Sequence, residues 1–248
     1  MCEKKISYLR KAFQGLFLLL VLMGLHRETA PFLALMLPLA FVAGNFFCGW
    51  LCPLGALQEV LGKLGARLTG KKYRLPERFR QPAQYTKYLL ALTLLGAIGL
   101  GLMKTEAVKS LFFDAYHSFF AVFEGSLPAA SAVVFLVLVL AVALFVDRPY
   151  CNYLCLNSIE YAVPSWTRLF TVVRNPDSCI QCGACDRKCP MLIRVSETRE
   201  LRNLQCINCF ECVAACPVSG TLTYGRAKRL TEKLKNGLKS LRGGNFPN

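Results

Sequence analysis

The chain has 248 residues, of which 54% are hydrophobic and 18% are charged, and its mean hydropathy of +0.38 is high for a soluble domain. Its net charge of +15 is gathered mainly in loops beside apolar segments. A membrane surface explains such loops, so nucleic acid is not an expected partner. The sequence contains no phosphate-binding glycine loop and no C-x-x-C-H motif, which excludes nucleotide-dependent chemistry and covalent haem.

Four segments carry almost no charge over lengths comparable to a bilayer core of roughly 30 Å. We therefore predict four transmembrane helices within a membrane domain of residues 1–155, running approximately over 13–25, 31–47, 84–103 and 127–146. The first could instead be a signal peptide, but no A-x-A cleavage signature follows it. If the N-terminus lies inside, twelve Lys and Arg residues near the predicted helices lie on the inner side of the membrane and three lie on the outer side. This asymmetry predicts cytoplasmic termini in a multi-pass protein of the cytoplasmic membrane.

Two C-x3-C motifs follow the second and fourth apolar segments. Cys48 and Cys52 belong to the first motif, Cys151 and Cys155 to the second, and an aromatic residue precedes each. The duplication predicts two parallel two-helix repeats, with both motifs at the cytoplasmic face. Spacing of i, i+4 places two thiols on one helix face. The four thiols are candidates for a third metal centre or for dithiol redox chemistry, and they can also be small buried hydrophobes.

The loop between the third and fourth segments is rich in aromatic residues and contains Asp114, His117 and Glu124. These three side chains are candidates for a quinone site, where a carboxylate or imidazole accepts protons. Aromatic anchoring at the membrane interface explains the same composition. His26 and His117 are the only histidines, and a bis-histidine haem needs two facing imidazoles, so we do not expect a haem.

The most specific pattern is a C-x2-C-x2-C-x3-C-P run that occurs twice within forty residues. This is the spacing of bacterial two-cluster ferredoxins, in which the fourth cysteine of each run binds the other cluster. Structural zinc does not require the third cysteine or the proline. We predict two [4Fe–4S] clusters in a ferredoxin-like α+β domain of residues 156–225, the first held by Cys179, Cys182, Cys185 and Cys216, and the second by Cys206, Cys209, Cys212 and Cys189.

Residues 226–248 form a basic tail in which Leu230, Leu234, Leu238 and Leu241 recur at helical spacing. This pattern predicts an amphipathic helix that lies on the membrane surface or docks an acidic partner.

Together, the C-x3-C-P motif at Cys48, the second C-x3-C motif at Cys151 and the C-terminal cysteine runs resemble one family. It is the NapH/NosR type of membrane polyferredoxin, and the resemblance covers roughly residues 13–224. It implies electron transfer between the quinone pool and a partner redox protein. Leu156 replaces the proline after the second motif, a departure from the family pattern.

Two functions are compatible with these features. In the first, the protein is the electron-transfer component of a quinol-oxidising complex, and its partners are membrane lipid, quinone and either other redox subunits or an acidic soluble electron carrier. In the second, it is a metal-reducing or assembly factor whose C-x3-C pairs handle a soft metal such as copper for a client enzyme.

Overall fold

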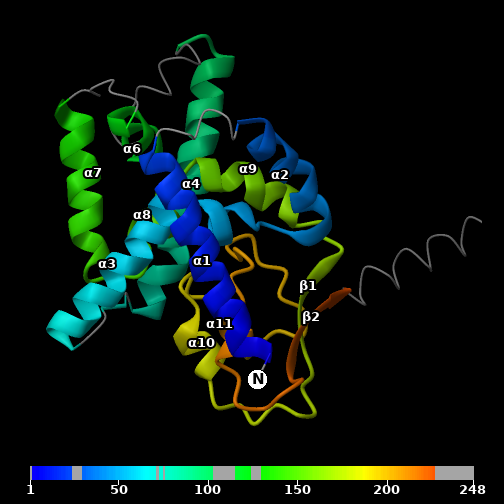
Figure 1. The fold of residues 1–248 in the computed structure, drawn as a ribbon. Coiled ribbons are helices and arrows are strands. Elements are labelled where there is room, and N and C mark those ends of the chain that lie inside the picture. Colours follow the sequence, from blue (N-terminus) through cyan, green and yellow to red (C-terminus); the bar gives the residue numbers. More distant parts are fainter. Residues whose placement is uncertain are drawn as a thin grey trace, which may run out of the picture.

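The computed structural model describes residues 2–23, 30–70, 73–74, 76–102, 115–123 and 130–226 (Figure 1). In these residues the elements in chain order are α1 (Cys2–Leu22), α2 (Ala30–Ala43), the π-helix η2 (Phe47–Leu51), α3 (Pro53–Thr69), α4 (Glu77–Gly99), α6 (Ala115–Phe123), α7 (Ala130–Ala143), α8 (Pro149–Tyr153), α9 (Asn157–Ser165), β1 (Phe170–Arg174), α10 (Ala184–Lys188), α11 (Glu211–Ala214) and β2 (Leu222–Arg226).

The helices before β1 form one part of the molecule, and the two strands with α10 and α11 form the other (Figure 1). Helix α1 connects the two parts, because it packs against η2 and α3 in the first part and against α11 in the second. Helix α2 packs on α9 and also contacts β1. The cysteine-rich second part is therefore held against the helices on more than one side.

The sequence around α3 shows why this helix begins and ends where it does. Pro53 occupies its first turn, where a missing N–H costs nothing, and the Cys52 sulfur accepts a hydrogen bond from the Gly55 amide at 3.4 Å. Gly70 ends the helix with a φ of +66°. Within α3, Gly65 lies so close to the Leu144 carbonyl that no side chain fits between them. Helix α3 can therefore lie directly against the end of α7.

The sheet consists of two antiparallel strands, with Val172 opposite Tyr224. An isolated bridge between Val173 and Glu200 adds a short third segment at the other edge of β1. Short helices and a small sheet around the cysteines agree with the ferredoxin-like α+β domain expected from the sequence.

Two hydrophobic clusters make up the core of the described residues. One lies in the cysteine-rich part and includes Val172, Ile193, Leu201 and Leu222. The other lies among the helices and includes Phe17, Leu54, Leu136 and Tyr150. Cys48 packs against both clusters, so the first C-x3-C motif lies at the boundary between the two parts.

The prediction of four transmembrane helices, and with it the two-helix repeats that span a bilayer, is wrong for the described residues. None of their helices combines the length and the apolar character that crossing a bilayer requires. Helices α2 and α7 have only 14 residues each, about 21 Å at 1.5 Å per residue. Helices α1 and α4 are longer, but Arg10 and Lys87 lie within them and are buried in protein contacts.

The predicted amphipathic helix of the tail lies outside the described residues, since the structure describes the chain only as far as Arg226.

Candidate iron–sulfur site

The four cysteines predicted to hold the first cluster line one cavity. Cys179, Cys182, Cys185 and Cys216 surround a small cavity of about 20 Å³. Cys182 is exposed, while the other three are partly exposed. The fourth cysteine of the second run thus lies beside the first three of the first run, which is the crossed arrangement expected of two-cluster ferredoxins. We call these four residues the outer tetrad.

The four cysteines predicted to hold the second cluster are buried together. Burial raises the pKa of Cys212 well above its ordinary value, and the neighbouring thiols of Cys209, Cys189 and Cys206 raise it further. Burial also raises the pKa of Cys189 to about 12, with Cys209 and Cys206 adding to the effect. We call these four residues the middle tetrad. Its thiols are close enough to affect one another electrostatically, and metal binding would require their deprotonation.

The two cysteine runs fold in the same way. Gln181 and Gly183 in the first run have φ values of 53° and 65°, and Asn208 and Phe210 at the matching positions of the second run have 47° and 56°. Left-handed residues alternating with right-handed ones turn successive N–H groups to one side, which creates a concavity for anions and iron–sulfur centres. For Phe210 this conformation is strained, and such strain concentrates at functional sites. The loops therefore have the backbone shape that cluster binding uses.

The two C-x3-C motifs also share a local structure. The amide of Cys52 donates to the Phe47 carbonyl and the amide of Cys155 donates to the Tyr150 carbonyl, each five residues back and each at 2.9 Å. Such π-type turns occur frequently at functional sites. Each motif is then followed by a longer helix, α3 or α9. The i, i+4 pairs therefore do not sit on continuous α-helices as expected, because each pair spans a one-turn helix and the residue or two beyond it.

The structure brings the four C-x3-C cysteines together, and we call them the inner tetrad. Cys52, Cys151 and Cys155 are buried and Cys48 is partly buried. Burial raises the pKa of Cys155 well above its ordinary value, and the thiols of Cys151, Cys48 and Cys52 raise it further. Burial likewise raises the pKa of Cys48 to about 11. The Gln58 side-chain amide donates to the Cys151 sulfur at 3.5 Å.

Buried positive charges surround the inner tetrad. Arg148 and Lys87 are 0% and 1% exposed. The Lys87 ammonium donates to the carbonyl of Cys151 at 3.3 Å, the hydroxyl of Ser158 at 3.0 Å and the side-chain oxygen of Gln205 at 2.7 Å. All three acceptors are neutral, and no described carboxylate pairs with Lys87. Burial lowers the pKa of Lys87, while the nearby thiols, Cys155 first, act in the opposite direction.

Glu59 is the acid at the centre of this region. It pairs with Arg10 and, at 3.5 Å, with Arg148. Burial opposes ionisation of Glu59, but the guanidinium groups of Arg148 and Arg10 outweigh that effect and lower its pKa to about 2. Glu59 is therefore an anion at neutral pH and compensates part of the buried positive charge.

Contacts between backbones connect the inner and middle tetrads. Gly49, between Cys48 and Cys52, lies against the backbone of Ile207 with no room for a side chain. Next to it, the Trp50 indole donates to the Asn208 carbonyl at 2.9 Å. Arg10 donates to the Gly49 carbonyl at 2.9 Å and pairs with Glu211 of α11 at 2.7 Å. The first C-x3-C motif and the second ferredoxin loop therefore form one packed unit.

The residues predicted for a quinone site, and the histidines considered for a haem, have no described side chains near the three tetrads. Asp114, Glu124 and His26 lie outside the described residues, and His117 is placed only as a position on α6. Arg148 was not predicted as a site residue from the sequence, and Arg10 and Lys87 were only two of the twelve Lys and Arg residues expected on the inner side of the membrane. The available signal was the position of Arg148, a lone cation between a long apolar segment and a C-x3-C motif.

In the part of the chain that the structure describes, no three His, Cys, Asp or Glu side chains are grouped so that they could hold a single metal ion. The spacing of the cysteines in the outer and middle tetrads is instead that of [4Fe–4S] ligands, in which four thiolates surround a centre made of several atoms.

Comparisons with known proteins agree with this chemistry. A family model described as a 4Fe-4S dicluster domain matches residues 171–217, which contain the outer and middle tetrads. A second model, described as a 4Fe-4S binding domain, matches residues 30–72 and 128–155, which contain the inner tetrad. The structure and these matches define a ferredoxin-type iron–sulfur protein that binds [4Fe–4S] clusters.

Three individual proteins that this chain resembles illustrate the family. YccM of Escherichia coli, whose name provisionally assigns it to electron transport, is 33% identical over 85% of this chain. The regulatory protein NosR of Pseudomonas aeruginosa is 31% identical over 67% of it, and the ferredoxin-type protein NapH of Haemophilus influenzae is 27% identical over 71%. The chain spans 59%, 23% and 61% of these relatives' own lengths. The chain belongs to this family of ferredoxin-type 4Fe-4S proteins, which confirms the resemblance seen in the sequence. It matches no solved structure.

Proposed function

We propose that this protein transfers electrons between a quinone and a partner redox protein through iron–sulfur centres held by its cysteine tetrads. When bound, [4Fe–4S] clusters supply one-electron redox chemistry. The observation that carries the proposal is that one tetrad reaches the surface while the other two lie in the interior and share packing contacts. The outer tetrad includes the exposed Cys182, the middle tetrad is buried, and Cys48 of the inner tetrad packs against the core that contains the middle one.

The proposal includes a third metal centre at the inner tetrad, in addition to the two ferredoxin-type clusters. Four thiols from two distant segments meet in a buried region, and the 4Fe-4S model that matches residues 30–72 and 128–155 covers them all. Coincidental packing of small hydrophobic cysteines does not account for the polar groups around them, such as the Gln58 amide directed at the Cys151 sulfur.

The buried charges favour the same centre. Three buried cations, Arg10, Arg148 and Lys87, face two carboxylates, Glu59 and Glu211, among the described residues around the inner tetrad. The Nε atom of Arg148 is buried and has no described hydrogen-bond acceptor. An uncompensated buried cation costs several kcal/mol. A centre ligated by four thiolates carries negative charge and would compensate both Lys87 and Arg148.

Metal analysis tests this part of the proposal. Protein reconstituted under anaerobic conditions should contain about eight irons from the two ferredoxin-type clusters, plus those of the third centre. Replacement of Cys48 or Cys151 by Ser should remove only the additional iron and its sulfide. Cys179→Ser should remove iron from the outer centre instead, and Cys2→Ser, a cysteine outside all three tetrads, should remove none. Equal iron in the Cys48→Ser and Cys2→Ser proteins would exclude the third centre.

The alternative function, handling of a soft metal for a client enzyme, is less well supported. Transfer of a metal between proteins needs accessible thiols, and Cys52, Cys151 and Cys155 are all buried. Burial favours a resident centre over a metal that is passed on. Copper in place of the additional iron, lost selectively in Cys48→Ser, would reverse this preference.

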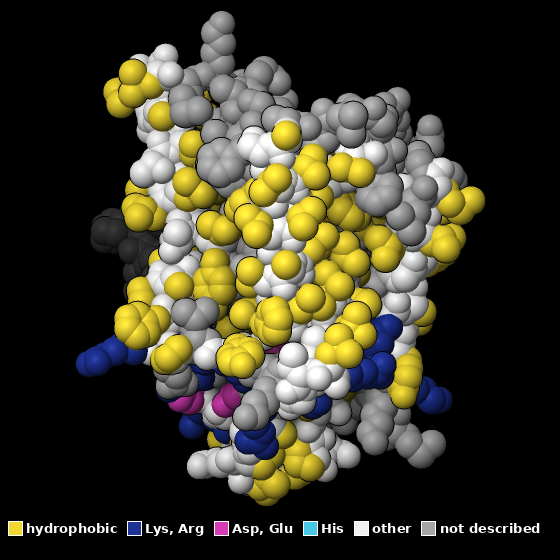
Figure 2. Space-filling model, turned by 90° about the vertical axis from the view of Figure 1, so that its left-hand side faces the viewer, with side chains coloured by type: hydrophobic (Ala, Val, Ile, Leu, Met, Phe, Trp, Pro, Cys, Tyr) yellow, Lys and Arg dark blue, Asp and Glu magenta, His cyan; other side chains and the backbone are white. Residues whose placement is uncertain are grey.

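A hydrophobic surface supports contact with a membrane, where a quinone would be found. Figure 2 shows a broad hydrophobic face with Lys and Arg side chains along its lower border. Apolar surfaces of this extent mark lipid or protein interfaces, and basic residues beside them favour anionic headgroups. Large hydrophobic side chains are exposed on several of the helices before β1, including Leu16 and Leu19 of α1, Leu92 and Leu95 of α4, and Val134 and Val137 of α7.

Two measurements test the membrane and quinone parts. Without detergent, the protein should float with vesicles that contain an anionic phospholipid, and recovery of all the protein in the aqueous fraction would contradict membrane contact. A quinol added anaerobically should reduce at least one centre, as seen by EPR. Absence of reduction by any quinol, in protein that a viologen radical reduces fully, would exclude quinone as the redox partner.

A further inference from the structure

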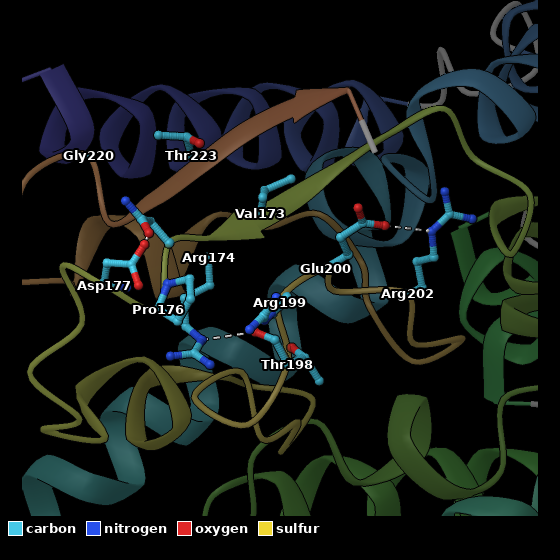
Figure 3. A pocket seen from close by; sticks show the side chains of 11 residues that line it. Val173, Arg174, Pro176, Asp177, Thr198, Arg199, Glu200, Arg202, Gly220 and Thr223 are labelled. Atoms are coloured by element: carbon cyan, nitrogen blue, oxygen red, sulfur yellow. Dashed lines mark hydrogen bonds and ion pairs between the residues drawn. The ribbon is translucent and has the colours of Figure 1, made fainter. Parts of the chain in front are cut away.

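An arginine-rich groove runs along the surface beside the outer tetrad. Its first section has a volume of about 1130 Å³ and is lined by Arg174, Arg199 and Arg202, among others (Figure 3). A second section of about 350 Å³ is lined by Arg80, Arg194 and Arg202. Arg202, with Thr198 and Glu200, lines both sections, so they form one continuous depression. We call it the arginine groove.

The groove carries an excess of positive charge. Its five arginines face three carboxylates, those of Asp177, Glu197 and Glu200. Two of these acids are already paired, Glu200 with Arg202 at 3.3 Å and Glu197 with Arg194 at 2.8 Å. Figure 3 shows the Arg174, Arg199 and Arg202 side chains spaced along the depression. Arginine is the cation best suited to bind carboxylates through two parallel hydrogen bonds.

Arg174 connects the groove to the outer tetrad, because it lines both the groove and the cavity of the four cysteines. Its guanidinium donates to the Thr198 carbonyl at 2.9 Å. A hydrogen bond from the Gln181 backbone, and then one from the Arg174 side chain, lower the pKa of Cys179. A molecule in the groove would therefore lie next to the residue that contacts a ligand of the most exposed centre.

From this geometry we infer that the arginine groove is the docking site of a soluble electron-carrier protein with an acidic surface. The inference rests on the proposed electron-transfer function and specifies the partner of its outer centre. The combined groove is larger than the 300–1,000 Å³ typical of small-molecule sites. Its concave shape does not match a flat bilayer. Arginine with nearby exposed aromatic residues, such as Tyr85 at the second section, is the composition of protein interfaces.

Stopped-flow kinetics with a reduced, acidic two-cluster bacterial ferredoxin as the probe tests the inference. Arg199→Glu and Arg80→Glu should each lower the second-order rate constant for electron transfer about threefold to tenfold at low ionic strength. The loss should diminish as salt is added. The matched control is Arg67→Glu, which makes the same charge change at an exposed position in the last turn of α3, away from the groove. It should change the rate less than twofold.

The reduced methyl viologen radical, a small cation, separates the possible failures. It should reduce the centres of all variants at least as fast as those of the unaltered protein. If it reduces no centre in the unaltered protein, the proposed function fails. If it does reduce them, but the ferredoxin rate falls equally in Arg67→Glu or in no variant, only the docking site is refuted. Loss of binding to anionic vesicles by Arg199→Glu, with an unchanged ferredoxin rate, would assign the groove to lipid headgroups and overturn the inference.

Discussion

Gly49→Ala should separate the inner and middle tetrads with the smallest possible change in the side chain. A Cβ at this position would lie less than 3.0 Å from the Ile207 carbonyl oxygen, closer than Cβ atoms approach other heavy atoms. Both sides of the contact are backbone, so relief requires movement of the whole C-x3-C turn or of the cysteine loop. That movement would strain the hydrogen bonds that Arg10 and Gln14 each make to the Gly49 carbonyl at 2.9 Å.

Overpacking of a filled core costs about 1–3 kcal/mol, and each weakened hydrogen bond to a charged group adds about 1 kcal/mol or more. We therefore expect Gly49→Ala to lose about 2–4 kcal/mol of stability. Because cluster proteins unfold irreversibly, the measurement is the half-life of visible absorbance at raised temperature under anaerobic conditions. That half-life should fall by at least tenfold, since 1.4 kcal/mol corresponds to a factor of about ten.

Gly96→Ala in α4 is the matched control, because a Cβ there meets no atom within 4 Å. Alanine is the better helix former by up to about 1 kcal/mol, so this variant should be as stable as the original protein or more so. If Gly49→Ala lasts as long as Gly96→Ala, the two tetrads are not packed through Gly49 and the interpretation of this contact is wrong.

Three further variants test the buried charges and the strained loop. Glu59→Gln should lower stability at pH 7 by roughly 3 kcal/mol, since the Glu59 pKa falls from 4.5 to about 2 on folding and each pKa unit corresponds to about 1.4 kcal/mol. Because the pKa of Glu59 is depressed in the folded state, this contribution is fully present above pH 4.5 and is lost as the pH falls toward 2. Urea denaturation at several pH values should therefore show the free energies of unfolding of the two proteins converging as the pH is lowered. Lys87→Met should lower the reduction potential of the nearest centre by tens of millivolts in an EPR-monitored titration, because a buried positive charge stabilises the reduced state. Lys87→Arg keeps the charge, so its reduction potential should stay close to that of the unaltered protein. Equal potentials in the two variants would exclude an electrostatic role for Lys87. Phe210→Gly should relieve about 1 kcal/mol of left-handed strain but lose ring contacts with Tyr224 and Phe46 at 5.0 and 5.8 Å, so a net loss of stability is expected, and a gain would show that the aromatic contacts contribute little.

The ferredoxin-like part could be predicted because the residues that specify it lie close together in the sequence. The spacing within each cysteine run and the proline after it specify a loop and a short helix, and the structure places α10 and α11 at those positions. The grouping of Cys216 with the first run followed from the known crossing of ligands between runs. The left-handed conformation of Phe210 could not be foreseen, because an aromatic residue disfavours it and only the surrounding contacts hold it there.

The four-span prediction failed because an apolar segment does not reveal where a helix ends. The segment of residues 31–47 appeared continuous, but α2 ends at Ala43 and Gly44 follows with a φ of +90°. Charge counting also left the role of two cations unrecognised. Arg10 and Lys87 were counted as cations at a membrane boundary, yet both are less than 2% exposed and bind backbone carbonyls near the cysteines. Counting cannot distinguish a solvated lysine from one that is buried and hydrogen-bonded.

The environment of the inner tetrad depends on contacts between the two copies of the C-x3-C motif. Gln58, six residues after Cys52, donates to the sulfur of Cys151 and accepts from the amide of Tyr150 in the other copy. At the equivalent distance after Cys155, Tyr161 stacks on Phe47 in the first copy, with ring centroids 4.9 Å apart. Each copy therefore positions the cysteines of the other. Neither pair has this environment alone, so the inner tetrad is a property of the duplication and not of either motif.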